Sequence, residues 1–241
     1  MTSINRVLQI AQRELDVKEV GDNINKYAQW YDPDLNGQSW CAIFVSYCLY
    51  HADLKVCIET DKGFHYTPNG SKWFKEQKQW FKEPLPGDIV FFDWQNEKDD
   101  LPGAANHVAF FVAQTQDNRI ITIDGNSPPD DESNSGQVRY KIRDFNSQIM
   151  GFGRPPYDNP KSESIPLLSN ISTSCLVTAS EDVQIWQQQM IACGYDFGDS
   201  GADGAFGRCS RQVLEQFQQK LGFKVNGVLD VVSWQAAWTA I

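Results

Sequence analysis

Residues 39–50 read SWCAIFVSYCLY, an apolar run that predicts a buried helix with a cysteine, Cys41, in its first turn. Ser39 is a candidate N-cap for this helix. Unpaired backbone N–H groups and the positive end of the helix dipole then lie beside the Cys41 sulfur and favour its thiolate, which is a nucleophile. The alternative is that Cys41 is one more small buried hydrophobic residue, the usual place of a free cysteine.

The composition is that of a globular, acidic protein. The 241 residues are 41% hydrophobic, and the length exceeds the commonest domain size, so two domains are expected. The formal net charge of -10 argues against a nucleic acid or an anionic membrane as the main partner. We expect a monomer that does not insert into membranes.

The N-terminal residues enter an amphipathic pattern directly, so no signal peptide is expected and synthesis in the cytoplasm is the working hypothesis. Six cysteines in a chain of this length are too few and too spread for a disulfide scaffold, which predicts free thiols. A zinc site near Cys41 is not supported, because Cys41, Cys48, His51 and Cys57 lack the close pairs of structural zinc sites.

Two helices are expected ahead of Cys41. Residues 3–16 place apolar side chains on one helical face, and residues 24–31 repeat that spacing after a candidate cap, Asn23. The second helix should end at Asp32, because the residue before a proline resists the α conformation.

The loop at 32–38 places Asp32 and Asp34 ahead of a glycine, like the first half of a calcium-binding loop. An EF-hand is excluded, because Ile43 stands where that motif needs a glutamate. The alternative is a polar turn that leads into the helix of Cys41.

The residue pattern changes after a short helix predicted at 71–79. Short β-rich segments follow, bounded by turn residues, at 89–94, 107–113, 119–124, 137–142 and 149–153. Helices first and antiparallel strands afterwards predict an α+β domain.

Two of these strands carry polar groups that can meet. With a period of two, His107 lies on one face of its strand, and Asp124 and Asn126 share a face of the next. A cysteine, a histidine and an acid or amide that orients the imidazole form the constellation of thiol acyl transfer. A backbone N–H at the helix start is one candidate oxyanion donor, and Gln38 is a second.

Residues 25–155 resemble the CHAP family, the cysteine, histidine-dependent amidohydrolases and peptidases of peptidoglycan metabolism. The resemblance rests on KYAQWY at 26–31, WCAIFVS at 40–46, PGDIVFF at 86–92, NHVA at 106–109 and DGNS at 124–127.

This resemblance implies a papain-like fold. It also implies that Cys41 is the nucleophile, that His107 is the general base and acid, and that Asp124 and Asn126 orient the imidazole, without deciding which of the two bonds to it. Some relatives bind calcium where Asp32 and Asp34 stand, although a further acidic ligand of those relatives corresponds to Ile43 here. The family therefore implies no required cofactor, with calcium as a hypothesis.

A second domain is expected beyond a linker at 157–175, which is rich in Pro and Ser. Helical spacing continues over 183–190, 213–221 and 233–238, and a turn followed by a helix cap occurs twice, as DGAFGRCS at 203–210 and NGVLDVVS at 226–233. Residues 180–241 resemble the three-helix peptidoglycan-binding domain of wall hydrolases. The predicted domains are 1–156, CHAP-like, and 176–241, all-α.

These resemblances imply a peptidoglycan hydrolase, either an N-acetylmuramoyl-L-alanine amidase or an endopeptidase, directed to the cell wall by its second domain. The lack of an export signal suggests a phage endolysin that acts on the wall after release. Two alternatives stay open: an antibacterial amidase effector delivered by secretion, and a non-catalytic wall-binding or virion structural protein.

Overall fold

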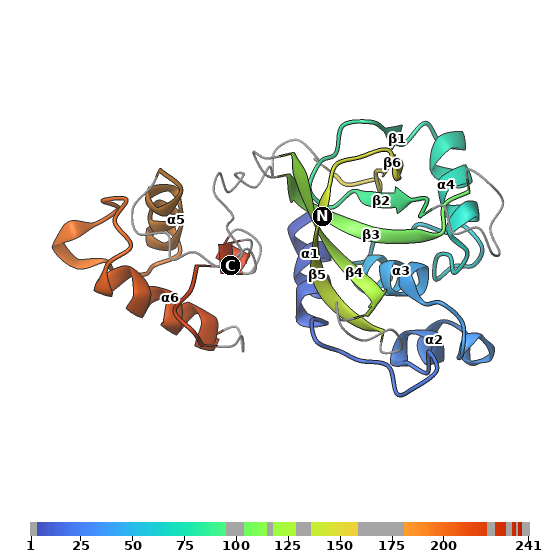
Figure 1. Ribbon diagram of the computed structural model, residues 1–241, viewed down its shortest axis with the longest axis horizontal. Coiled ribbons are helices and arrows are strands. Elements are labelled where there is room, and N and C mark those ends of the chain that lie inside the picture. Colours follow the sequence, from blue (N-terminus) through green and yellow to red (C-terminus); the bar gives the residue numbers. More distant parts are fainter. Residues whose placement is uncertain are drawn as a thin grey trace. The chain divides into compact units, whose positions relative to one another are not determined.

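A computed structural model describes residues 4–94, 104–114, 118–128, 136–158, 181–220, 225–229, 233–234 and 236–237. The chain divides into two compact units (Figure 1). The first contains the helices α1 to α4 and a six-stranded sheet, and the second contains α5 and α6. The α+β class, with helices ahead of an antiparallel sheet and a helical C-terminal region, is confirmed.

Four helices precede the sheet along the chain, and α3 is the most buried of them. Helix α3 spans Cys41–His51, and it carries apolar residues around its whole circumference, as is typical of a helix inside a core. The others are α1 at Ile4–Arg13, α2 at Lys26–Tyr31 and α4 at Thr67–Glu76. Among the described residues, no helix combines the length and apolarity that a membrane crossing requires.

The caps predicted for α2 and α3 are both wrong. The α2 helix is capped by Asn25, whose side chain accepts hydrogen bonds from the N–H groups of Tyr27 and Ala28, so Asn23 lies outside it. The cap position of α3 is Trp40, without a side-chain cap bond, because the helix begins one residue later than a Ser39 cap requires. The residue at the cap position therefore offers the first turn of α3 no side-chain acceptor.

The short helix predicted at 71–79 is also displaced. Helix α4 begins at Thr67 and ends at Glu76, because Pro68 is tolerated in the first turn, where an N–H would have no helical partner. Thr67 Oγ1 donates to Ala105 O at 2.5 Å, and this bond ties the start of α4 to the segment that enters β3.

The sheet has the order β1-β6-β2-β3-β4-β5, with antiparallel pairs throughout. The predicted strands are present, and β1, which pairs with β6 at one edge, was not predicted. The bounds are β1 Trp80–Phe81, β2 Ile89–Phe92, β3 His107–Gln114, β4 Arg119–Ser127, β5 Gln137–Asp144 and β6 Ile149–Gly153.

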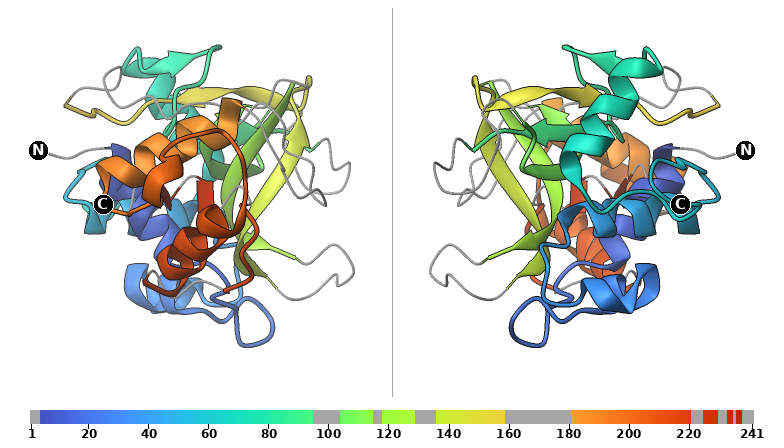
Figure 2. Two further views of the ribbon diagram at one scale, coloured as in Figure 1. Left: turned by 90° about the vertical axis from the view of Figure 1, so that its left-hand side faces the viewer. Right: turned by 90° about the vertical axis from the view of Figure 1, so that its right-hand side faces the viewer.

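Helix α3 packs on strands β3 and β4 of this twisted sheet (Figures 1 and 2). Phe44 meets Phe110 edge to face, with ring centroids 6.2 Å apart. The backbone of Gly125 approaches Phe44 so closely that an added Cβ would lie 2.5 Å from the Phe44 Cβ. A glycine is thus needed here for the helix of Cys41 to reach the strand that carries Asp124.

The second unit has its own apolar core around α5 at Glu181–Ala192 and α6 at Arg208–Lys220, with a 3-10 turn at Gly198–Ser200 between them. Two buried glutamines fix the two repeated turns. Gln187 Nε2 donates to Asp203, Ala205 and Ser210, and Gln218 Nε2 donates to Asn226, Val228 and Ser233. The repeat is therefore a structural device, but the predicted cap at Ser210 is wrong. Ser210 is the third residue of α6, and its Oγ donates to Ala205 O.

Parts of the predicted organisation lie outside the described residues. This applies to the linker at 157–175 beyond residue 158, and to much of the third helix at 233–238, of which residues 233–234 and 236–237 are helical. The domain bounds 1–156 and 176–241 stay a prediction.

Candidate active site

Cys41 is the first residue of α3, and it is 4% exposed. The N–H groups of a helix's first turn have no acceptor within the helix. The backbone N–H groups of Ala42 and Val108 hydrogen-bond to the Cys41 sulfur. Beside it, the indole Nε1 of Trp40 donates to Glu19 Oε2 at 2.9 Å and so fixes the residue at the cap position. The sulfur thus lies among donors that favour its ionised form.

His107 is the first residue of β3, and its imidazole bridges Cys41 and Asp124. Its Nε2 lies 2.7 Å from Asp124 Oδ2. Because Nε2 is engaged in this way, Nδ1 is the ring nitrogen left for its hydrogen bond with the Cys41 sulfur. The strand register explains the contact: Asp124 lies opposite Ala109, on the same face as His107 and diagonal to it.

The electrostatics of the pair favour an ion pair of thiolate and imidazolium. Burial by itself raises the pKa of Cys41, but the charge and the hydrogen bond of His107, with the two backbone N–H groups, outweigh it, and the net shift is downward. Burial by itself lowers the pKa of His107, but the Cys41 charge and the Asp124 bond raise it to about 9. Both shifts favour the thiolate of Cys41, which is the reactive form of a cysteine.

Asp124 is fully buried, and it is surrounded by donors. Arg143 Nη2 donates to Oδ2 at 2.6 Å, and Arg143 Nη1 donates to Oδ1 at 3.1 Å. Thr122 Oγ1 donates to Oδ1 at 2.5 Å. Burial opposes ionisation, but the Arg143 charge and the His107 contacts dominate and hold the pKa of Asp124 well below its usual value. The group that orients the imidazole is therefore a carboxylate.

Asn126, the other candidate for this role, lies elsewhere. It follows Asp124 by two residues in β4, with a left-handed φ of 52° at a register shift between β4 and β5. Its Oδ1 points toward Gly136, where an added Cβ would meet both this atom and Glu19 Oε2. No hydrogen bond between Asn126 and His107 is found in the described part of the chain, so the structure brings Cys41, His107 and Asp124 together and leaves Asn126 beside them.

The remaining predicted site residues precede α3. Gln38 is exposed, and its backbone N–H donates to Leu35 O. Asp32 caps the 3-10 turn at Pro33–Leu35, where Oδ1 accepts from Asp34 N at 3.1 Å. Within the residues that the structure describes, no group of three or more His, Cys, Asp or Glu side chains could hold a metal ion. Calcium at Asp32 and Asp34 stays a prediction, and no step below depends on it.

Sequence reasoning missed Arg143 and the aromatic wall behind the imidazole. The Phe92 and Trp94 rings stack 4.6 Å apart, and their centroids lie 5.8 and 5.9 Å from that of His107. A signal for Arg143 was present, because Arg139, Lys141 and Arg143 alternate along 137–144 and so share one face of that strand.

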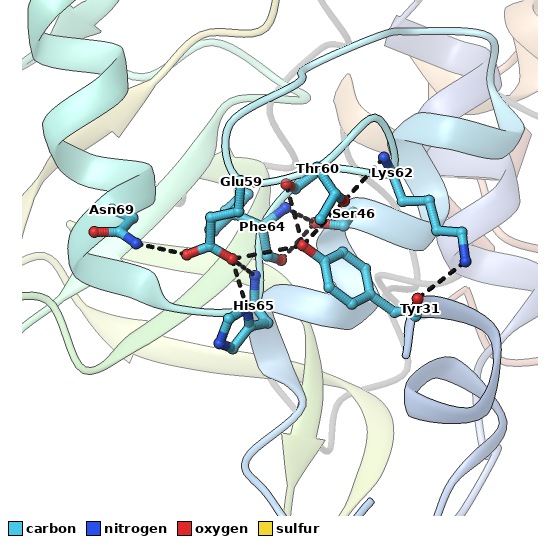
Figure 3. A network of polar contacts seen from close by, with 9 residues as sticks. Tyr31, Ser46, Glu59, Thr60, Lys62, Phe64, His65 and Asn69 are labelled. Carbon is cyan, nitrogen blue, oxygen red and sulfur yellow. Dashed lines mark hydrogen bonds and ion pairs between the residues drawn. The ribbon is translucent and has the colours of Figure 1, made fainter. Parts of the chain in front are cut away.

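The two other histidines of the chain lie near α3 and make contacts outside the site. The Nδ1 of His65 lies 2.5 Å from Glu59 Oε2, and the same carboxylate accepts from Asn69 and contacts Tyr31 (Figure 3). This network fixes the loop between α3 and α4. His51 is exposed and stands against aromatic rings at the far end of α3. His107 is thus the histidine that meets a cysteine.

Comparison with known families gives two matches. Residues 33–126 match the CHAP domain family, and residues 179–236 match the family described as "Putative peptidoglycan binding domain". Searches of curated proteins and of solved structures found no match. Both resemblances drawn from the sequence motifs are confirmed, and the first match contains Cys41, His107 and Asp124.

Proposed function

We propose that this chain, a cell-wall hydrolase whose CHAP domain is joined to a peptidoglycan-binding domain, cleaves an amide bond of bacterial peptidoglycan with Cys41 as the nucleophile. The observation that carries the proposal is the continuous chain of contacts from the Cys41 sulfur through the His107 imidazole to the Asp124 carboxylate. Cys41 is moreover in the first turn of a helix, where its thiolate is stabilised.

The first half of the reaction forms a thioester. The Cys41 thiolate attacks the carbonyl carbon of the scissile amide, and the carbonyl oxygen takes up negative charge. Backbone N–H groups at the start of α3 are suited to stabilise this oxyanion, because the helix offers them no acceptor. The C–N bond then breaks as the His107 imidazolium gives its Nδ1 proton to the leaving nitrogen, which departs as an amine.

The second half releases the acyl group. The imidazole, now neutral, accepts a proton from a water molecule whose oxygen attacks the thioester carbonyl. The C–S bond breaks, the acyl part leaves as a carboxylic acid that ionises, and the thiolate and imidazolium are restored. Asp124 holds the ring in one orientation throughout and favours its charged form.

The second domain supports the proposal through targeting. Tethering a hydrolase to a wall-binding domain raises its local concentration on an insoluble substrate. The proposal includes an endolysin-like role, in which the enzyme reaches the wall after release from the cytoplasm. The pairing of the two domain families supports that role.

The test is mass spectrometry of the soluble fragments released from purified peptidoglycan by the wild type, by Cys41→Ala and by Cys57→Ala. Cys57 is an exposed thiol outside the site, so its variant is the matched control. We expect fragments from the wild type and from Cys57→Ala alone, with equal wall binding by all three proteins. The new termini identify the bond as the N-acetylmuramoyl-L-alanine amide or a peptide bond. Equal release by Cys41→Ala would refute the thiol mechanism.

A further inference from the structure

We propose that Arg143 is a positioning residue for the reaction. Its guanidinium holds the Asp124 carboxylate in the one orientation that keeps the His107 imidazole toward Cys41. Its positive charge also keeps the net charge of the buried cluster at zero. The inference rests on the proposed function. It assigns a role to a residue of β5, a strand that contributes neither the nucleophile nor the base.

The first argument is the geometry of the clamp. Arg143 donates through two nitrogens to the two oxygens of Asp124, which is the planar, bidentate contact that a guanidinium makes and an ammonium cannot. Arg143 Nη1 also donates to Thr122 Oγ1 at 2.6 Å, and that hydroxyl donates onward to Asp124 Oδ1. Asp124 Oδ2 is thus hydrogen-bonded both to His107 and to Arg143.

The second argument is the support of the guanidinium itself. Its carbon lies 5.2 Å from the Phe92 ring centroid and 5.5 Å from that of Trp94. The same two rings flank the His107 imidazole. One aromatic wall therefore holds both the imidazole and the cation that orients its carboxylate partner, and Arg143 is itself only 18% exposed in its side chain.

The third argument is charge. The thiolate, imidazolium, carboxylate and guanidinium carry two negative and two positive charges, so the buried cluster is neutral with Arg143 and negative without it. A buried carboxylate is costly unless it is paired and hydrogen-bonded.

The two other cations on this face of β5 lie at other register positions. Arg139 is the cross-strand neighbour of Asp124, but its Nη1 donates to Pro128 O at 3.0 Å. Lys141 lies opposite Thr122, on the same face of β5. Among the described residues, the charged and titratable groups around Asp124 include Cys41 of α3, His107 of β3, Arg139, Lys141 and Arg143 of β5, and Glu19, which accepts from Trp40.

A second buried pair in the same unit is a natural control. Arg154 Nε and Nη2 donate to Asp88 Oδ1 and Oδ2 at 2.8 and 2.7 Å, so this pair also has bidentate contacts. Asp88 joins the turn before β2 to the end of β6, and its carboxylate accepts from Arg154 and from the Leu85 N–H. This pair is a structural clamp without a histidine.

The experiment compares Arg143→Gln, Arg143→Lys and Arg154→Gln with the wild type. The first readout is the rate of alkylation of Cys41 by iodoacetamide between pH 4 and 10, followed by mass spectrometry of the Cys41 peptide. This readout needs no peptidoglycan, so it can fail or succeed independently of the proposed function. The second readout is the rate of fragment release from purified peptidoglycan, and melting temperatures report folding.

For Arg143→Gln we expect the acid limb of the alkylation profile to move up by about one pH unit, because loss of a positive charge raises the proton affinity of its neighbours. Fragment release should fall about 100-fold. Arg143→Lys keeps the charge, so its profile should stay close to that of the wild type, while fragment release falls about tenfold because the fork on Asp124 is lost.

Arg154→Gln should lower the melting temperature and leave the alkylation profile unchanged. The proposal is overturned if Arg143→Gln, folded by its melting curve, shows the wild-type profile and wild-type fragment release. If Arg143→Gln does not fold, Arg143→Lys decides: unchanged fragment release by that variant would overturn the positioning role.

Discussion

Helix α3 carries two cysteines with opposite chemistry. Cys41 begins the helix and Cys48 lies two turns later, and both are buried. Burial raises the pKa of Cys48 well above its usual value, and the nearby Glu14 charge adds to that rise while Lys26 opposes it. At Cys41 the same burial is outweighed by His107 and by two backbone N–H groups. Burial keeps the Cys48 thiol protonated, whereas the partners at the helix start favour the thiolate of Cys41.

The first test compares the reactivity of these two thiols directly. At pH 7 we expect iodoacetamide to alkylate Cys41 at least about 100-fold faster than Cys48, because the thiolate is the reactive form. Cys41 should also react ahead of Cys57, which is exposed, so the order cannot follow from accessibility alone. The measurement is the time course of modification of each cysteine peptide by mass spectrometry.

The His107→Ala variant sharpens this comparison, because it removes the partner and leaves the helix. Cys41 should then react more slowly than Cys57, and wall cleavage should fall by about 10⁴-fold. His65→Ala, which affects the histidine paired with Glu59, is the matched control. Equal reactivity of Cys41 in both variants would mean that the helix start alone activates the thiol.

A smaller effect is expected in the pH profile of wall cleavage. His107 must be protonated to donate to the leaving nitrogen, and burial, which lowers its pKa, is outweighed by the Cys41 charge and the Asp124 bond, which raise it to about 9. Initial rates of fragment release should therefore hold up to that pH and fall about tenfold per unit above it.

Asp124→Asn tests the cause of this alkaline limb. The substitution removes a negative charge beside the imidazolium, so the limb should move down by about one pH unit. A limb that begins near the ordinary pKa of histidine in the wild type, or one that Asp124→Asn does not move, would contradict the ion pair.

The sequence predicted those parts of the site that depend on local residue patterns. The helical run at 39–50 identified Cys41, and the period of two placed His107 and Asp124 on faces that can meet. The choice between Asp124 and Asn126 could not be made in this way, because both lie on the same face and a register shift follows Asp124. That choice depends on the pairing of β4 with both of its neighbours.

Arg143 was missed for a related reason. Its side chain extends from β5 to Asp124 on β4, although its direct cross-strand partner is Ile120. The sequence does not state the register that makes this contact possible. The predictions of the helix caps were wrong by only one or two residues. The cap of α3 is Trp40 and not Ser39, and the cap of α2 is Asn25 and not Asn23. Residue patterns locate elements, whereas tertiary packing decides which residue ends them.

The smallest predicted effect concerns the two helix starts themselves. The Asn25 side chain accepts from Tyr27 N at 3.0 Å and Ala28 N at 2.9 Å, so Asn25→Ala should lower the free energy of unfolding by about 1 kcal/mol, as loss of an N-cap does. Ser39→Ala should change it by less than about 0.5 kcal/mol, because Ser39 makes no cap bond to α3. Urea denaturation of both variants measures the difference.

An equal loss of stability in the two variants would place a cap at Ser39 after all and contradict the structure. The expected inequality has a chemical meaning. A side-chain cap on α3 would occupy the N–H groups of its first turn, and one of these, the Ala42 N–H, hydrogen-bonds to the Cys41 sulfur instead. The helix that carries Cys41 begins without a cap bond, so its first turn remains available to the thiolate and, in the proposed reaction, to the oxyanion.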